Sequence, residues 1–243
     1  DINSDKEIII LPGSVEITLP KNDILVLNLD TPINIHTSLQ GIIEQINRKN
    51  GLSILAHPGY LIKPYTRRKL LRLDNFLGIE VYNPGKIPCP ESTHRWDFLL
   101  SCKYGEKIWG FASDDLHSLE RDAGRAWLMV KTEKRELFSI LEALKRGSFY
   151  ATTGVLIEDI DLNSDNRIYI KLSRLSKIKF IGYRHRLLQK NFGKEASYTF
   201  KKEDKYVRIE VKDLENKKKA WTQPIFVQEG KISYFPYSEG GYW

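Results

Sequence analysis

Apolar runs and helix-like stretches alternate over roughly the first 150 residues of the chain. Runs rich in Ile, Val or Leu predict strands at 7–11, 14–18, 24–29, 53–56, 78–82, 107–112 and 126–130. Apolar residues at helical spacing, with capping residues such as Thr37 and Ser38, predict helices at 39–50, 66–73, 92–102 and 133–146. This alternation predicts an α/β fold with a largely parallel sheet or barrel.

The pattern changes after about Gly154, where helical periodicity ends. Short β-like runs follow at 167–172, 178–183, 206–211 and 225–228, and turn-forming residues separate them. Many short strands joined by turns predict a small β-sandwich-like domain. We therefore expect two domains, one over residues 1–158 and a β-rich one over residues 159–243.

Composition and charge narrow the class of protein only a little. Apolar residues make up 41% and charged residues 28% of the 243 residues, as in ordinary globular proteins. Since no run approaches the roughly 18 apolar residues of a membrane span, we expect no membrane partner. The formal net charge of +7 comes with short, late Lys runs but no nucleic-acid-binding signature, which argues against nucleic acid as a partner.

Two further features concern the origin of the chain. Cys89 and Cys102 are too few for a disulfide framework and favour free thiols in a reducing, cytoplasmic compartment. The chain begins at Asp1 with neither an initiator Met nor a signal peptide, so we expect a fragment or a processed product.

Side chains that can bind metals fall on or just after the predicted strands. They are Glu16, His57, Asn83, Asp114, Asp115 and His117. In an α/β barrel the carboxyl ends of the strands meet over one face, so these groups are expected to share one site. Imidazole nitrogens and carboxylate oxygens together suit Zn²⁺, Mn²⁺ or Fe²⁺, which lower the pKa of bound water and polarise phosphoryl oxygens.

Each of these residues taken alone also has an ordinary structural interpretation. His57 precedes a proline, as many turn histidines do, and Glu16 could be an edge-strand carboxylate that faces water. Asp115 and His117 could serve as capping or loop hydrogen-bonding groups. Their shared position at strand ends is what favours a metal site.

Four motifs resemble those of the polymerase-and-histidinol-phosphatase (PHP) family of metallohydrolases. They are LPGSVEIT at 11–18, SILAHPG at 53–59, GIEVYN at 78–83 and FASDDLH at 111–117. Within that family the sequence is most similar to the CehA-like branch, through RWDFLL at 95–100, IWGFAS at 108–113 and LKRGSFYATTG at 144–154. The resemblance covers about residues 7 to 160.

The resemblance implies a distorted (β/α)7-type barrel and a divalent-metal site, with Zn, Mn or Fe, that hydrolyses a small-molecule phosphoester or related substrate. The implied metal ligands are Glu16, His57, Asp115 and His117. The candidate catalytic residues are Asn83, which would line the site, Asp114, and Arg125, whose guanidinium matches phosphate geometry. Arg125 could equally be a surface residue at a strand edge.

The chain departs from the family pattern at its start. It contains neither the opening HxH pair nor the TDH segment, and Asp23 stands where a His often follows the Glu motif. His36 precedes a predicted helix and is interpreted as a residue that flanks it. Two interpretations remain: an incomplete copy of a hydrolase with weak metal binding and little turnover, or a degenerate binding or scaffold module without catalysis. A nucleic-acid-associated protein is a third class, and the oligomeric state is left open.

Overall fold

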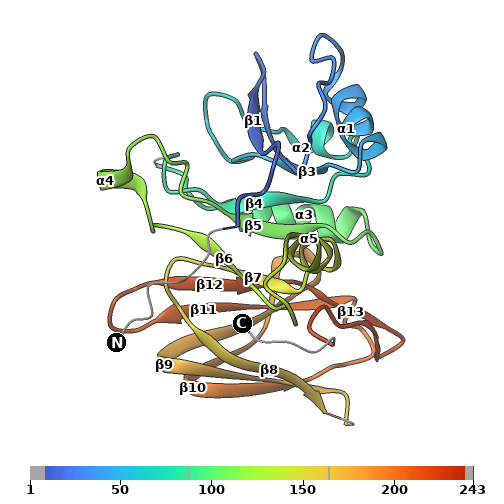
Figure 1. Ribbon diagram of the computed structural model, residues 1–243. Helices are drawn as coiled ribbons and strands as arrows, with labels where there is room; N and C mark the ends of the chain where they lie inside the picture. Colours follow the sequence, from blue (N-terminus) through green and yellow to red (C-terminus); the bar gives the residue numbers. More distant parts are fainter. Residues whose placement is uncertain (1–8, 87, 164, 239–242) are drawn as a thin grey trace.

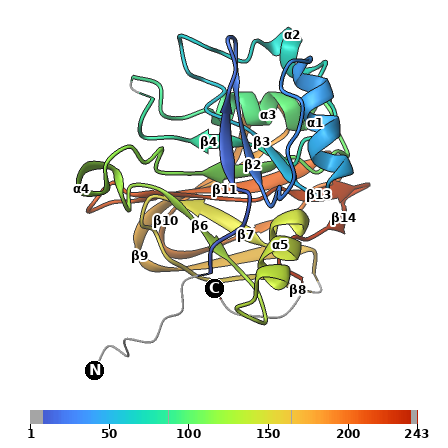
Figure 2. The same cartoon turned by 45° about the horizontal axis from the view of Figure 1, so that its top comes forward.

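The computed structural model describes residues 9–86, 88–163, 165–238 and 243, and it consists of two sheets with helices packed mainly on the first (Figure 1). The first sheet lies above the second in this view. In both views the segment with α4 (Leu119–Asp122) projects on the opposite side from α1 (Leu39–Arg48) (Figures 1 and 2). The candidate chemistry lies in the first sheet and its loops.

The first sheet has five strands in sequence order. They are β1 (Val15–Thr18), β2 (Asp23–Leu27), β3 (Leu52–Leu55), β4 (Gly78–Tyr82) and β5 (Trp109–Ala112). β1, β2 and β3 pair antiparallel, whereas β3, β4 and β5 pair in parallel. The carboxyl ends of three neighbouring strands therefore open toward the same edge.

Helices cover this sheet because their apolar residues recur on one face. In α1 the buried residues are Leu39, Ile42, Ile43 and Ile46, and the Ser38 hydroxyl accepts the Gly41 N–H at 3.1 Å as an N-cap. The other helices are α2 (Arg67–Leu70), α3 (Thr93–Cys102) and α5 (Leu137–Arg146). Among the described residues, no helix combines the length and the apolar character needed to cross a membrane.

The second sheet is antiparallel throughout its nine strands. They are β6 (Trp127–Val130), β7 (Phe149–Thr152), β8 (Ile157–Asn163), β9 (Arg167–Gly182), β10 (Arg186–Thr199), β11 (Tyr206–Asp213), β12 (Lys219–Thr222), β13 (Ile225–Gln228) and β14 (Lys231–Tyr234). Strand β9 changes partner midway: its first part pairs with β8 and its last part with β11. The short 3₁₀ turn η1 (Tyr183–His185) joins β9 to β10.

Most predicted elements of the first 150 residues are confirmed, with bounds that shift by a few residues. The strand at 78–82 has the predicted bounds. In the run predicted at 7–11, residues 7 and 8 lie outside the described residues, and residues 9–11 form no strand. The helix predicted at 66–73 is a single turn, and the helix predicted at 133–146 begins only at Leu137.

The expected barrel is not shown in the described part of the chain. The chain is of mixed α/β type, but its first sheet is open and β6 and β7 pair antiparallel in the second sheet instead of continuing the parallel set. The two strands predicted at 167–172 and 178–183 form one strand, β9, because the residues between them stay extended. The division of domains at residue 158 stays a prediction, and the second sheet includes β6 and β7 from before it.

Candidate metal site

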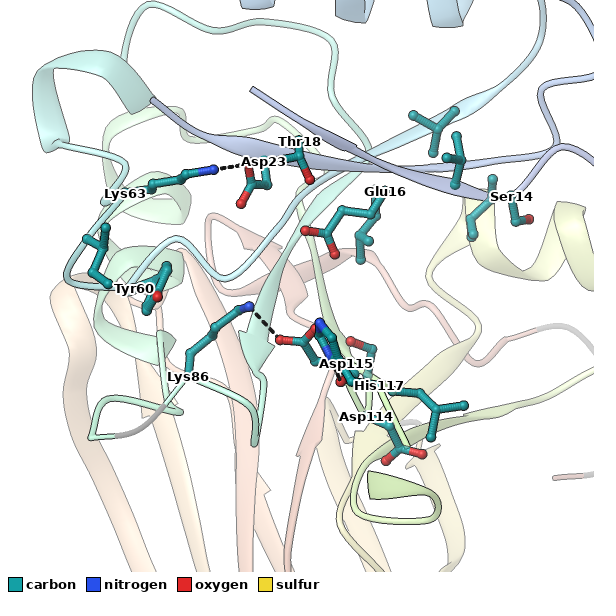
Figure 3. A pocket seen from close by; sticks show the side chains of 17 residues that line it. Ser14, Glu16, Thr18, Asp23, Tyr60, Lys63, Lys86, Asp114, Asp115 and His117 are labelled. Atoms are coloured by element: carbon teal, nitrogen blue, oxygen red, sulfur yellow. Dashed lines mark hydrogen bonds and ion pairs between the residues drawn. The ribbon is translucent and has the colours of Figure 1, made fainter. Parts of the chain in front are cut away.

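An open cleft of about 790 Å³ lies between the β1–β2 hairpin and the loops that follow β3, β4 and β5 (Figure 3). Its charged lining consists of Glu16, Asp23, Lys63, Lys86, Asp114, Asp115 and His117. The cleft thus combines carboxylates, an imidazole and two ammonium groups. It lies where the sequence predicts that polar groups gather.

The β1–β2 hairpin brings two carboxylates to the cleft. Thr18 lies opposite Asp23 in the register, and residues opposite each other in an antiparallel pair share a face. Glu16 is two residues from Thr18, so it shares that face as well. The turn before β1 requires Gly13, because its φ is +57° and a Cβ there would lie 1.8 Å from the Leu29 carbonyl oxygen.

Glu16, Asp23 and His57 form a cluster in which one ligand atom from each lies within 4.8 Å of the others. His57 Nε2 is 3.5 Å from Oε1 of Glu16 and 3.5 Å from Oδ2 of Asp23. The side chains of His57 and Asp23 are 2% and 7% exposed, whereas that of Glu16 is 33% exposed. The cluster is therefore buried on one side and open to the cleft through Glu16.

The unsatisfied ring of His57 fits a bound cation. Neither ring nitrogen has a hydrogen-bond partner, although both are buried, and 3.5 Å is too long for an ordinary N–H···O bond. Ligand atoms about 2.1 Å from a tetrahedral ion lie about 3.4 Å apart, close to the separations seen here. One imidazole and two carboxylates also suit Zn²⁺, Mn²⁺ or Fe²⁺.

The buried carboxylate of Glu80 holds the backbone on which His57 stands. Its Oε2 accepts the His57 backbone N–H at 2.5 Å and the Asn83 amide at 3.1 Å, and the Ser113 hydroxyl donates to Oε1. The three donors follow β3, β4 and β5, so Glu80 ties three strand ends together. Burial raises the pKa of Glu80, while these hydrogen bonds and His57 act in the opposite direction. His57 itself has a φ of +28°, a strained value that this contact helps to hold.

Asp115 and His117 line the same cleft but stand apart from the cluster. Asp115 Oδ2 pairs with Lys86 Nζ at 2.7 Å (Figure 3). The His117 side chain is 71% exposed, and its Nδ1 lies 2.8 Å from the Asp115 carbonyl oxygen and 3.5 Å from Oδ1. Of the four predicted ligands, the structure thus brings Glu16 and His57 into the cluster and leaves these two beside it.

The three candidate catalytic residues make contacts within the protein. Asp114 accepts the backbone N–H groups of residues 124, 125 and 126 at 2.7, 2.7 and 2.6 Å. Arg125 donates to the Pro84 carbonyl at 3.0 Å. Asn83 is 2% exposed and bonds Glu80 and the Gly85 N–H. Of the three, Asp114 lines the cleft. The catalytic roles of Asn83, Asp114 and Arg125 stay predictions.

Four further residues of the site have no assigned role at the sequence level: Asp23, Lys63, Glu80 and Lys86. Lys63 Nζ lies 3.1 Å from Oδ1 of Asp23. The hairpin register could have indicated Asp23, since Asp23 lies opposite Thr18, and Thr18 is two residues from Glu16 on the same face. A carboxylate inside the apolar run of β4 is the signal for Glu80. No spacing rule indicates the lysines, because loops bring them in.

Comparisons with known proteins add a structural likeness. No model of a protein family matches the chain, and no curated protein sequence does. It is similar to a solved two-domain protein from Bacteroides vulgatus ATCC 8482 that contains a predicted PHP-like metal-dependent phosphoesterase. The TM-score is 0.44 at 15% sequence identity, over 91% of this chain and 72% of that chain.

Proposed function

We propose that this protein is a metal-dependent hydrolase that holds a divalent ion on Glu16, Asp23 and His57 and acts on a small-molecule phosphoester or a related substrate. The observation that carries the proposal is the His57 ring, which is buried without a hydrogen-bond partner and has Nε2 3.5 Å from a carboxylate oxygen of each acidic residue. Such a ring is costly to bury unless something binds it.

Three residues of the site would bind the ion, and a fourth positions one of them. His57 and Asp23, which are buried, would hold the ion from one side, and Glu16, which is partly exposed, would hold it from the open cleft. Glu80 fixes the backbone of His57. A bound Zn²⁺, Mn²⁺ or Fe²⁺ would lower the pKa of a water molecule and polarise a phosphoryl oxygen.

The two lysines of the cleft support an anionic substrate. The side chains of Lys63 and Lys86 line the cleft and are 24% and 17% exposed. Positive groups beside a metal ion favour phosphoryl oxygens, on which negative charge develops during hydrolysis. We further propose that the chain belongs to the PHP family, on the motifs around Glu16, His57 and Asp115, and to its CehA-like branch, on the motifs at 95–100, 108–113 and 144–154.

Metal binding is the first test, since three ligands hold an ion whether or not a substrate turns over. We expect His57→Ala and Asp23→Asn each to weaken Mn²⁺ affinity, measured by isothermal titration calorimetry. The loss should be at least about 10-fold, since removal of even an outer-shell partner has that effect. His36→Ala is the matched control, because His36 is exposed in the segment before α1. Unchanged affinity in both site variants would refute the assignment.

Catalysis is tested separately with bis(p-nitrophenyl) phosphate in the presence of Mn²⁺. We expect hydrolysis that falls in the His57→Ala, Asp23→Asn and Asp115→Asn variants and persists in His36→Ala. The competing candidate is a binding or scaffold module, favoured by the pairing of Asp23 with Lys63 and of Asp115 with Lys86. Metal binding without hydrolysis of any phosphoester would support that candidate.

A further inference from the structure

A second carboxylate–imidazole pair lies in the cleft, yet a lysine already occupies it. Asp115 and His117 offer the donor types of a divalent-metal site. The Asp115 side chain is only 5% exposed, and its Oδ2 lies 2.7 Å from Lys86 Nζ. A cation approaching that oxygen from the cleft would have to displace the ammonium group.

The turn after β4 holds Lys86 in this position. The Asn83 side chain accepts the Gly85 N–H at 3.0 Å, and the Lys86 N–H donates to the Asn83 carbonyl at 3.3 Å. A Cβ on Gly85 would lie 2.6 Å from Oδ2 of Asp115, so a larger residue there would push the carboxylate away from its present position. The Tyr60 ring then lies 5.1 Å from the ammonium nitrogen, at cation–π distance.

The charge on Lys86 is secured by its neighbours. The Lys86 ammonium nitrogen lies 2.7 Å from Oδ2 of Asp115, and an opposite charge this close favours the charged form of the lysine. The ammonium group is therefore charged near neutral pH. His117 offers little competition, because its Nδ1 faces the Asp115 carbonyl and its side chain is 71% exposed.

We infer that Lys86 acts as a built-in cation that takes the place of a second metal ion, so that the cleft binds one divalent ion per chain. This inference rests on the proposed function, since it presupposes an ion on Glu16, Asp23 and His57. Lys86 neutralises Asp115, repels a second ion beside the first, and leaves its remaining N–H groups available for an anionic oxygen of the substrate. Lys86 is thus a residue that sets metal stoichiometry and substrate charge.

The test measures the number of Mn²⁺ ions bound per chain by isothermal titration calorimetry and elemental analysis. We expect one ion in the unmodified protein and in Lys86→Arg, which keeps the positive charge. We expect two ions in Lys86→Ala, and one again in the double variant Lys86→Ala with Asp115→Asn. Lys190→Ala is the matched control, since Lys190 also lies over an aromatic ring, Phe192, at 5.8 Å, but on the second sheet. That variant should bind one ion.

Each other outcome has a distinct meaning. Two ions in the unmodified protein, or one ion in a folded Lys86→Ala variant, would overturn the inference and leave the first metal site standing. No ion in the unmodified protein would overturn the proposed function and this inference with it. Circular dichroism establishes folding, and Lys86→Gln, which removes the charge but keeps a long side chain, takes the place of Lys86→Ala if that variant does not fold: one ion there would also contradict the inference.

Discussion

At the scale of single residues, Asp114 and Asp115 have different partners although they are adjacent in sequence. Asp115 has a φ of +53° and pairs with Lys86 in the cleft. The Asp114 carboxylate instead accepts three consecutive backbone N–H groups, those of residues 124 to 126. The left-handed turn at Asp115 separates the two carboxylates, and it directs Asp114 toward the loop before β6.

This arrangement gives Asp114 a testable role in stability. Its three bonds are 2.6–2.7 Å long and join a carboxylate to N–H groups, which makes them stronger than neutral hydrogen bonds. We expect Asp114→Ala to lower the free energy of unfolding by about 2–4 kcal/mol in urea denaturation. Mn²⁺ affinity should change little. Asp30→Ala, at an exposed position, is the control; an equal loss in both variants would contradict the role.

Two of the three residues of the metal cluster could be predicted from the sequence. Glu16 and His57 were indicated by strand position and motif, and both lie in the cluster. Asp23 shows in the sequence only as a departure from a motif, because its role depends on the cross-strand register with Thr18. Asp115 was expected beside them, but a lysine from another loop binds it. The position of Asp115 depends on loop conformation, which local periodicity does not encode, so the sequence could not show that a lysine would pair with it.

At the scale of elements, strong apolar periodicity predicted what the structure confirms. The isoleucines of α1 and the apolar run of β4 gave correct elements because each buries a whole face. Strand β10 was not predicted, since most of its residues are exposed or half-buried and its sequence is largely polar. Its hydrogen-bonded pairing with β9 makes it a strand, although its own side chains show no strand pattern.

The end of α5 offers a prediction about an element boundary. Gly147 caps the helix with a φ of +75°, and a Cβ there would lie 2.8 Å from the Trp109 ring. Gly124 has a similar φ of +71° but has no heavy atom within 4 Å of such a Cβ. We expect Gly147→Ala to lower the free energy of unfolding by about 2–4 kcal/mol and Gly124→Ala by about 1 kcal/mol. Equal losses in thermal or urea denaturation would show that the Trp109 contact contributes nothing.

At the scale of the whole molecule, a few buried polar contacts join the two sheets. The Gln223 side chain bonds both the N–H and the carbonyl of Gly110 in β5, at 2.8 and 2.9 Å. Asp97 on α3 accepts two bonds from Arg208 on β11 and one from the Tyr206 hydroxyl. Gln223 is 113 positions from Gly110, and Arg208 is 111 positions from Asp97. Contacts between residues so far apart in the chain leave no local pattern, so the sequence alone could not reveal how the second sheet packs on the first.

Asp97 makes the junction between the sheets sensitive to substitution. Its side chain is 1% exposed and that of Arg208 is fully buried. Loss of the carboxylate leaves the guanidinium charged without its main partner in a dry environment. We expect Asp97→Asn to lower the free energy of unfolding by about 3–5 kcal/mol. The double variant Asp97→Asn with Arg208→Met should recover part of this loss, because it removes the unpaired charge.

The same pair predicts how stability depends on pH. Burial raises the pKa of the Asp97 carboxyl, but Arg208 and His185 outweigh burial and lower it to about 2, below its ordinary value of 3.8. A lowered pKa in the folded state gives stabilisation that is complete above pH 3.8 and is lost as the pH falls toward 2. The contribution is about 2 kcal/mol. Urea denaturation of the unmodified protein should therefore show a steeper loss of stability between pH 4 and 2 than Asp97→Asn does. Parallel pH profiles for the two proteins would mean that Asp97 has the same pKa folded and unfolded, and that its charge does not hold the sheets together.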